Sequence, residues 1–246
     1  LSYFIDFHRS HPEYKFMIPP FLLSEKSAYI SGHLPKFRED LFWTEDGKLC
    51  LNATSEMMLG NYHREELLPA EDLPLKYFAF STCFRREAGA YRTEERGMIR
   101  GHQFNKIEMF HFTKPENSWI AFDELLNYAE QLVEGLGLHY NTVQLAAGDC
   151  SAAMAKTVDI EVWIPSMKTY KEVSSVSNAL DYQARRGDIR FKDKDGKNKF
   201  VHTLNASGLA TSRVLPAILE QFQQADGTVL IPKALQKYMG KKVIGK

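Results

Sequence analysis

The sequence contains no long apolar segment and very few cysteines. No run approaches the roughly 18 to 20 consecutive apolar residues that a membrane-spanning helix requires, so we expect a protein that does not cross a membrane. The three cysteines, Cys50, Cys83 and Cys150, lie far apart, and none has a partner at zinc-ligand spacing. These absences argue against a secreted disulfide scaffold and a thiolate metal site, and they predict a soluble, cytoplasmic protein.

The sequence also lacks an excess of charge of either sign and the usual nucleotide-binding motifs. Its 31 Lys and Arg residues balance 31 Asp and Glu residues, so no global field attracts nucleic acid or a membrane. There is no G-x-x-x-x-G-K-[ST] motif, and Gly135-Leu136-Gly137 ends a helical pattern instead of opening one. A bound nucleotide must therefore be held by something other than a P-loop or a Rossmann site.

What is present is the composition of an ordinary globular protein. The chain has 246 residues, of which 44% are hydrophobic and 25% are charged. We find no internal repeat, low-complexity tract or linker-like stretch. The simplest organisation is a single domain that spans residues 1–246.

Hydrophobic periodicity predicts both helices and strands. The expected helices cover residues 1–10, 55–68, 113–135 and 209–223, the third opened by a capping box at Thr113-Lys114-Pro115-Glu116. The expected strands cover residues 14–18, 48–52, 75–85, 99–112, 158–164, 170–176, 188–192 and 199–206. Because a parallel sheet needs a crossover helix between nearly every strand pair, this order predicts an α+β fold, an antiparallel sheet flanked by helices.

The hairpin of the third and fourth strands carries the clearest chemical signal. Arg85 and Glu87 share one face of the first strand. The partner strand carries charged and aromatic residues on one face, namely Arg100, His102, Phe104, Lys106 and Glu108. Alternating charge usually marks a solvated face, but a large ring in its middle argues against that explanation. Guanidinium groups suit phosphates and a ring suits a purine, so this face is a candidate open site for ATP.

Several motifs resemble those of class II aminoacyl-tRNA synthetases, in the form used by seryl-tRNA synthetases. Cys83-Phe84-Arg85-Arg86-Glu87-Ala88-Gly89 and the segment from Arg96 to Phe104 resemble motif 2, and Gly208-Leu209-Ala210-Thr211-Ser212-Arg213 resembles motif 3. Pro19-Pro20 looks like the end of motif 1, Thr54-Ser55-Glu56 like the Thr-x-Glu loop, and the segment from Glu172 to Asn178 like the Glu-x-Ser-Ser-x-Ser-Asn run. The resemblance covers nearly the whole chain in order and implies the class II catalytic fold.

The resemblance also implies a role for each matching residue. The implied ATP-binding residues are Arg85, Glu87, Arg100, Phe104, Glu172, Ser175 and Arg213, with Arg85 and Arg213 as the catalytic arginines. The implied serine-binding residues are Thr54, Glu56, Arg85, Glu108, Asn205 and Ser207. Glu172 and Ser175 would hold Mg²⁺, which prefers oxygen ligands. On a regular strand their i, i+3 spacing would place them on opposite faces, so the prediction requires the strand to bend or end between them.

The implied activity is ATP-dependent activation of L-serine as seryl-adenylate, followed by transfer to tRNA(Ser) by a homodimer. Two features depart from the family. The hairpin loop reads Arg92-Thr93-Glu94-Glu95-Arg96-Gly97 where Gly-Arg-Asp-Thr-Arg-Gly is common, and the family's N-terminal coiled-coil arm has no counterpart here. We therefore expect weakened tRNA binding, although two basic clusters, residues 185–199 and 233–246, are further candidate RNA surfaces. Two alternatives stay open, a homologue that activates an amino acid for another acceptor and a non-catalytic synthetase-like binding module.

Overall fold

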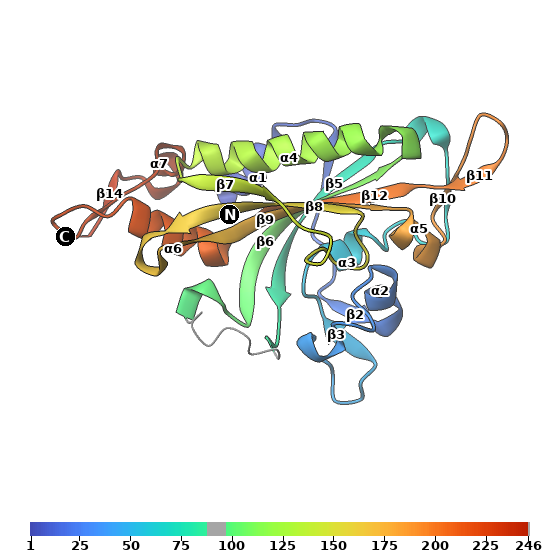
Figure 1. Cartoon of the computed structure of the whole chain (residues 1–246), viewed down its shortest axis with the longest axis horizontal. Coiled ribbons are helices and arrows are strands. Elements are labelled where there is room, and N and C mark those ends of the chain that lie inside the picture. Colours follow the sequence, from blue (N-terminus) through green and yellow to red (C-terminus); the bar gives the residue numbers. More distant parts are fainter. Residues whose placement is uncertain (88–96, 246) are drawn as a thin grey trace.

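A seven-stranded sheet forms the centre of the protein (Figure 1). The computed structural model describes residues 1–87 and 97–245; residues 88–96, which include most of the altered hairpin loop, lie outside the described part. The strand order is β1 (Tyr14–Met17), β5 (Leu75–Phe84), β6 (Gln103–Thr113), β12 (His202–Ala210), β9 (Thr169–Leu180), β8 (Lys156–Ile164) and β7 (Tyr140–Gln144). All neighbouring strands are antiparallel except β1 and β5, which run parallel. The predicted α+β class is confirmed, with one parallel pair that the sequence did not indicate.

One long helix, α4 (Ser118–Gly135), runs along one side of the sheet (Figure 1). Its apolar stripe recurs every three or four residues, and Phe122, Leu125 and Leu132 of that stripe are almost completely buried. They belong to a core with Met109 and Ile160 from the sheet, and α1 (Ser2–Arg9) and α6 (Thr211–Gln221) contribute to the same core. Within the described residues, no helix is both long and apolar enough to span a membrane.

Smaller elements gather on the opposite side of the sheet (Figure 1). They are α2 (Glu25–Ile30), α3 (Glu56–Leu59), α5 (Tyr182–Gly187), the pair β2 (Leu22–Ser24) and β3 (Leu49–Leu51), and the sheet of β4 (Leu67–Leu68), β10 (Arg190–Lys192) and β11 (Asn198–Phe200). The chain ends with β13 (Val229–Leu230), α7 (Lys233–Met239) and β14 (Val243–Ile244). The candidate site lies on the central sheet, where residues of β6, β8, β9 and β12 and of the segments around α2 and α3 line a common space.

Several predicted elements differ in extent from the observed ones, and three of these differences change the local structure. The helix expected at 55–68 is only α3, because the chain turns after Gly60 and Leu67 and Leu68 pair with β10 instead. The capping box is absent, since Thr113 belongs to β6 and Pro115 begins a 3₁₀ turn before α4. The strand expected at 199–206 is interrupted at Val201, which separates β11 from β12.

Candidate active site

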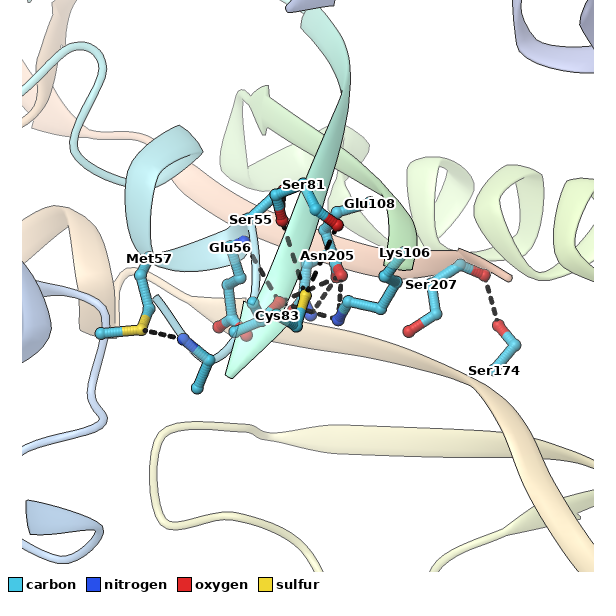
Figure 2. A network of polar contacts seen from close by, with 12 residues as sticks. Ser55, Glu56, Met57, Ser81, Cys83, Lys106, Glu108, Ser174, Asn205 and Ser207 are labelled. Atoms are coloured by element: carbon cyan, nitrogen blue, oxygen red, sulfur yellow. Dashed lines mark hydrogen bonds and ion pairs between the residues drawn. The ribbon is translucent and has the colours of Figure 1, made fainter. Parts of the chain in front are cut away.

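The hairpin of β5 and β6 forms the floor of the site. The two strands pair along their whole length, with Ala79 opposite Glu108 and Cys83 opposite Phe104. Because side chains alternate along a strand, Phe104, Lys106 and Glu108 lie on the same face of β6. Figure 2 shows Lys106 and Glu108 together with Asn205 from the neighbouring strand β12.

A buried polar network surrounds Glu108, which is only 1% exposed. Thr54 Oγ1 donates a hydrogen bond to Glu108 Oε2 at 3.1 Å. Asn205 Nδ2 donates to Glu108 Oε1 at 3.2 Å (Figure 2). Lys106 forms an ion pair with Glu108 and also donates to Thr54 Oγ1 at 2.7 Å. The carboxylate is thus compensated by three donors, which is what a buried charge requires.

A second carboxyl group, Glu56, lies at the start of α3 and is also buried. Gln183 Nε2 of α5 donates a hydrogen bond to its Oε1 at 2.7 Å. Burial and the negative charge of Glu108 raise the pKa of Glu56 to about 7, even though Lys106, Gln183 and Arg85 act to lower it. Glu56 therefore changes charge near neutral pH.

Arg85 and Phe104 face each other, with the guanidinium carbon 5.2 Å from the ring centroid. Arg85 lies directly after the end of β5, where its backbone N–H donates to His102 O at 2.9 Å and its Nε donates to Ala53 O at 3.4 Å. The ring and the guanidinium group therefore stand in the arrangement that the sequence predicted, although Arg85 and Glu87 follow the strand instead of belonging to it.

Glu87 and Arg100 form an ion pair of 2.5 Å across the hairpin. The prediction that Arg100 lies within a strand over residues 99–112 is wrong, because residues Gly97–Ile99 form a 3₁₀ turn and β6 begins only at Gln103. Glu87 has a positive φ of 53°, which is unusual for a non-glycine residue and turns the chain away from the strand direction.

Glu172 and Ser175 lie on the same side of β9 because the strand contains a bulge between them. Asp159 pairs with Ser175 and Ile160 with Ser174, but Glu161 pairs with Glu172, so Val173 is an extra residue. The prediction required the strand to bend between these two residues, and the bulge at Val173 provides that bend.

Asp159 stands opposite Ser175 on the neighbouring strand β8 and is 8% exposed. Its Oδ1 is buried without a hydrogen-bond partner among the described residues. Burial, together with the negative charges of Glu172 and Glu161, raises the pKa of Asp159 to about 7, against the opposing effects of a hydrogen bond from Ser175 and the charge of Arg213. Glu172, Asp159 and Ser175 together offer two carboxyl groups and one hydroxyl group, which are the oxygen ligands that a hard cation prefers. Among the described residues, Asp159 Oδ1 still lacks a hydrogen-bond partner.

Arg213 lies in the first turn of α6 and reaches across to β9. Its Nη1 donates to Glu172 O at 2.8 Å and lies 3.5 Å from Glu172 Oε2, while its Nε donates to Ile99 O at 3.4 Å. The strand before it is irregular, because β12 has a register shift between Ser207 and Ala210 and Leu209 has a φ of 73°. The shift lets β12 end beside the hairpin, so that α6 begins with Arg213 directed toward the site.

Two adjoining cavities contain all twelve residues that the resemblance selected. The larger, about 370 Å³, is lined by Thr54, Glu56, Arg85, Glu108, Glu172, Ser175, Asn205 and Ser207 among others. The smaller, about 90 Å³, shares Arg85, Glu172 and Ser207 with it and adds Glu87, Arg100, Phe104 and Arg213. The structure therefore brings the predicted residues together, while the role of each stays a prediction.

The sequence did not predict several polar residues of the larger cavity, among them Lys106, Asp159 and His33. The sequence predicts the correct strand face for Lys106, and its even spacing from Glu108 is a sufficient signal that the two side chains line the same space. Asp159 and Glu161 alternate with apolar residues along β8, which predicts that they share a face. The pattern does not predict which residues of other strands lie beside Asp159. His33, whose pKa is lowered to about 3 by burial and by the positive charges of Arg85 and Lys106, had no local signal because only the tertiary fold brings it there.

Comparisons with known proteins agree with this geometry. Residues 42–222 match the family model of the tRNA synthetase class II core domain (G, H, P, S and T). The chain is 56% identical to serine--tRNA ligase 2 of Clostridium acetobutylicum and 52% identical to serine--tRNA ligase of Caldicellulosiruptor bescii, and these matches cover 98% and 99% of it. It spans 58% of the length of each of these curated relatives.

Solved structures give the same result. Seryl-tRNA synthetase from Pyrococcus horikoshii, complexed with ATP, matches 99% of the chain at a TM-score of 0.94 and 41% identity, and the match covers 54% of that protein. Cytoplasmic serine-tRNA ligase from Naegleria fowleri, in complex with AMP, matches 99% at a TM-score of 0.91 and 37% identity, covering 57% of that protein. The chain therefore belongs to the class II tRNA synthetase core family, and its sequence and fold are similar to those of the catalytic cores of seryl-tRNA synthetases.

Proposed function

We propose that the protein is a serine-activating ligase, which forms seryl-adenylate and pyrophosphate from L-serine and ATP and then transfers serine to tRNA(Ser). The observation that carries the proposal is the pair of adjoining cavities. One is rich in carboxyl, amide and hydroxyl groups, the other combines a ring with guanidinium groups, and Arg85 lines both.

The larger cavity suits a small zwitterion with a hydroxyl group. Its carboxyl groups Glu56 and Glu108 are complementary to an ammonium group, and Arg85 is complementary to a carboxylate. Thr54, Asn205 and Ser207 supply short polar groups for a hydroxyl. A pocket built around such hydrogen bonds discriminates against alanine by on the order of 10⁴, because its buried polar groups lose their partner, whereas threonine has to be excluded by size.

The smaller cavity suits the nucleotide. Phe104 offers a face for stacking on adenine, Glu87 offers a carboxylate for its exocyclic amine, and Arg100 and Arg213 offer positive charge to the phosphates. In this arrangement the serine carboxylate is presented to the α-phosphorus beside Arg85, which lies at the junction of the two cavities.

Glu172 and Ser175 would hold Mg²⁺, with Asp159 adjacent. Among the described residues no group of three or more His, Cys, Asp or Glu side chains is arranged to hold a metal ion, but Mg²⁺ typically uses one or two carboxylates together with water and substrate phosphates. The donor set described above fits that requirement. When bound, the ion would neutralise phosphate charge.

The chemistry requires no protein nucleophile or general base. An oxygen of the serine carboxylate attacks the α-phosphorus, the bond to the pyrophosphate oxygen breaks, and pyrophosphate leaves. Arg85 and Arg213 stabilise the charge that develops around the α-phosphorus as the adenylyl group is transferred, and the cavity walls hold the two reactants in line.

The decisive assay is amino-acid-dependent exchange of labelled pyrophosphate into ATP. We expect exchange with serine, at least about a thousandfold less with alanine, and little with threonine or glycine. Glu108→Gln should abolish most of the exchange, because it removes the charge around which the pocket is built. The matched control is Glu130→Gln, a carboxyl group of α4 hydrogen-bonded to Thr142, which should leave exchange unchanged. No exchange with any amino acid would favour the non-catalytic binding module.

Transfer to tRNA(Ser) is tested in the same preparation by adding tRNA and measuring the acid-precipitable product. Exchange without transfer would support activation for another acceptor, such as a carrier protein, or the need for segments outside these 246 residues.

The first strand supports a homodimer. Within residues 1–87 and 97–245, β1 pairs with β5 alone and leaves its other edge open. Phe16 in β1, Ile18 directly after it and Leu22 at the start of β2 are 41%, 66% and 51% exposed. An open strand edge beside exposed apolar side chains is typical of an interface between two copies of a chain.

A further inference from the structure

Gln183 is a fully buried amide behind the wall of the larger cavity. It is the second residue of α5, is 1% exposed, and makes three hydrogen bonds to three different segments of the chain. Its Nε2 donates to Glu56 Oε1 at 2.7 Å and to Ser31 O at 3.1 Å. Its Oε1 accepts a hydrogen bond from Thr203 Oγ1 of β12 at 2.7 Å.

The orientation of this amide has only one chemically possible assignment. A backbone carbonyl has no proton to donate, so only the NH₂ group of Gln183 can face Ser31 O. The same NH₂ group supplies the donor to Glu56, and the amide oxygen is left for the hydroxyl group of Thr203. Both N–H groups and the oxygen are thereby used, and the Gln183 side chain has a single favourable position.

These contacts connect two walls of the cavity. Glu56 lines it from α3, while Ser31, at the end of α2, is followed by Gly32 and His33, and all four residues line the same space. Gln183 itself is absent from the lining. It therefore touches Glu56 from behind, and among the described residues no hydrogen bond to the second carboxyl oxygen, Oε2, is found.

We propose that Gln183 is a positioning residue for serine binding, which fixes the Glu56 carboxyl group and the loop after α2 in the geometry that the substrate needs. The inference rests on the proposed function, because it takes Glu56 as a group that binds serine.

The charge of Glu56 gives this role a measurable signature. The charged groups that act on it are Glu108 and Lys106 of β6 and Arg85, which follows β5. Burial raises the pKa of Glu56 to about 7, and the hydrogen bond from Gln183 is one of the contacts that lower it. Removing that donor should raise the pKa further, so that less of the carboxylate exists at neutral pH.

The test is Gln183→Met, which keeps the shape of the side chain and removes all three hydrogen bonds. We expect the serine Kd at pH 7, measured by calorimetry, to rise roughly ten- to a hundredfold, while the ATP Kd stays the same. Serine affinity in the unmodified chain should rise with pH through about 7, and in the variant this inflection should move to higher pH.

The matched control is Gln221→Met. Gln221 is another bridging amide, which accepts from His139 N at 2.7 Å and donates to Trp163 O at 2.7 Å, and none of these three residues lines either cavity. Its variant should lose stability without any change in serine Kd or in the inflection. If Gln183→Met does not fold, Thr203→Val carries the test, because it removes only the hydroxyl that orients the amide, and Thr203→Ser should restore the affinity.

Two results would overturn the inference in distinguishable ways. A folded Gln183→Met or Thr203→Val chain with an unshifted inflection and unchanged serine Kd contradicts the role of Gln183 alone. An unmodified chain that binds ATP but no serine contradicts the proposed function, and the inference with it.

Discussion

At the scale of single residues, the candidate site contains two carboxyl groups whose ionised form is disfavoured by burial. Glu56 and Asp159 are both buried carboxyl groups, and burial raises the pKa of each to about 7. Ordinary stabilising ion pairs have the opposite effect on a carboxyl pKa. Ionisable groups whose pKa values are strongly shifted by their surroundings are typical of functional sites.

Glu56→Gln should therefore stabilise the free protein in alkaline solution. A carboxyl group whose pKa rises on folding, here from 4.5 to about 7, contributes stability below about pH 4.5 that is lost as the pH rises through 7. Glutamine stays neutral throughout, so we expect the variant to gain about 2 kcal/mol more at pH 8 than at pH 5. Urea denaturation at both pH values measures this difference, and an equal gain at both would contradict the cause given for the shift.

The residues that could be predicted are those whose neighbours are set by strand alternation. Phe104 and Glu108 share a face simply because they are an even number of positions apart, and the structure keeps them there. Gln183 and His33 could not be found in this way. Their place at the cavity depends on how α5 and α2 pack against the sheet, which no local pattern encodes.

At the scale of elements, the cavity depends on irregularities in otherwise regular segments. The bulge at Val173 brings Glu172 to the side of Ser175, and the register shift in β12 directs α6 toward the hairpin. The loop after α2 turns at Gly32, whose φ of 88° favours glycine. A β-carbon at Gly32 would lie 2.8 Å from the Ala153 β-carbon, so the two loops that line the cavity touch at this point.

Gly32→Ala should weaken both stability and serine binding. The left-handed backbone costs about 1 kcal/mol for a non-glycine residue, and the collision with Ala153 should push the two loops apart. Gly47→Ala is the matched control, because Gly47 also has a positive φ, 68°, but nothing lies within 4 Å of its β-carbon position. We expect similar backbone costs in thermal denaturation but a higher serine Kd only in Gly32→Ala; equal serine affinities would show that the contact does not shape the cavity.

The elements predicted well were those with a strong period, such as α4 and β8, whereas short segments followed their tertiary partners. Residues 60–68 have a helix-like pattern, yet Leu68 is buried against β10 and the pairing there decides the conformation. The short strand β7 and the helices α5 and α7 went unrecognised, because each is too short for periodicity to separate it from a loop.

At the scale of the whole molecule, much of the predicted basic surface is neutralised locally. In the cluster at residues 185–199, Arg185 pairs with Asp181, Arg190 with Asp188 and Lys199 with Asp193. Arg186 donates hydrogen bonds to the carbonyl oxygens of Tyr29 and Leu34, so it supports the fold. The positive charge available to RNA at this end of the molecule is therefore smaller than the sequence count indicated.

The apolar edge of β1 leads to the prediction that concerns the assembled protein. If two copies meet along this edge, Ile18→Glu would bury an unpaired charge in the interface and should weaken dimerisation roughly a hundredfold. Ile120→Glu is the matched control, because Ile120 of α4 is as exposed as Ile18, at 71% against 66%, but lies on another surface. Sedimentation across a concentration series should show a dimer for the unmodified chain and for Ile120→Glu, and a monomer for Ile18→Glu. A monomeric unmodified chain would exclude the dimer. Equal dissociation of both variants would place the interface elsewhere, because only Ile18 lies beside the open strand edge.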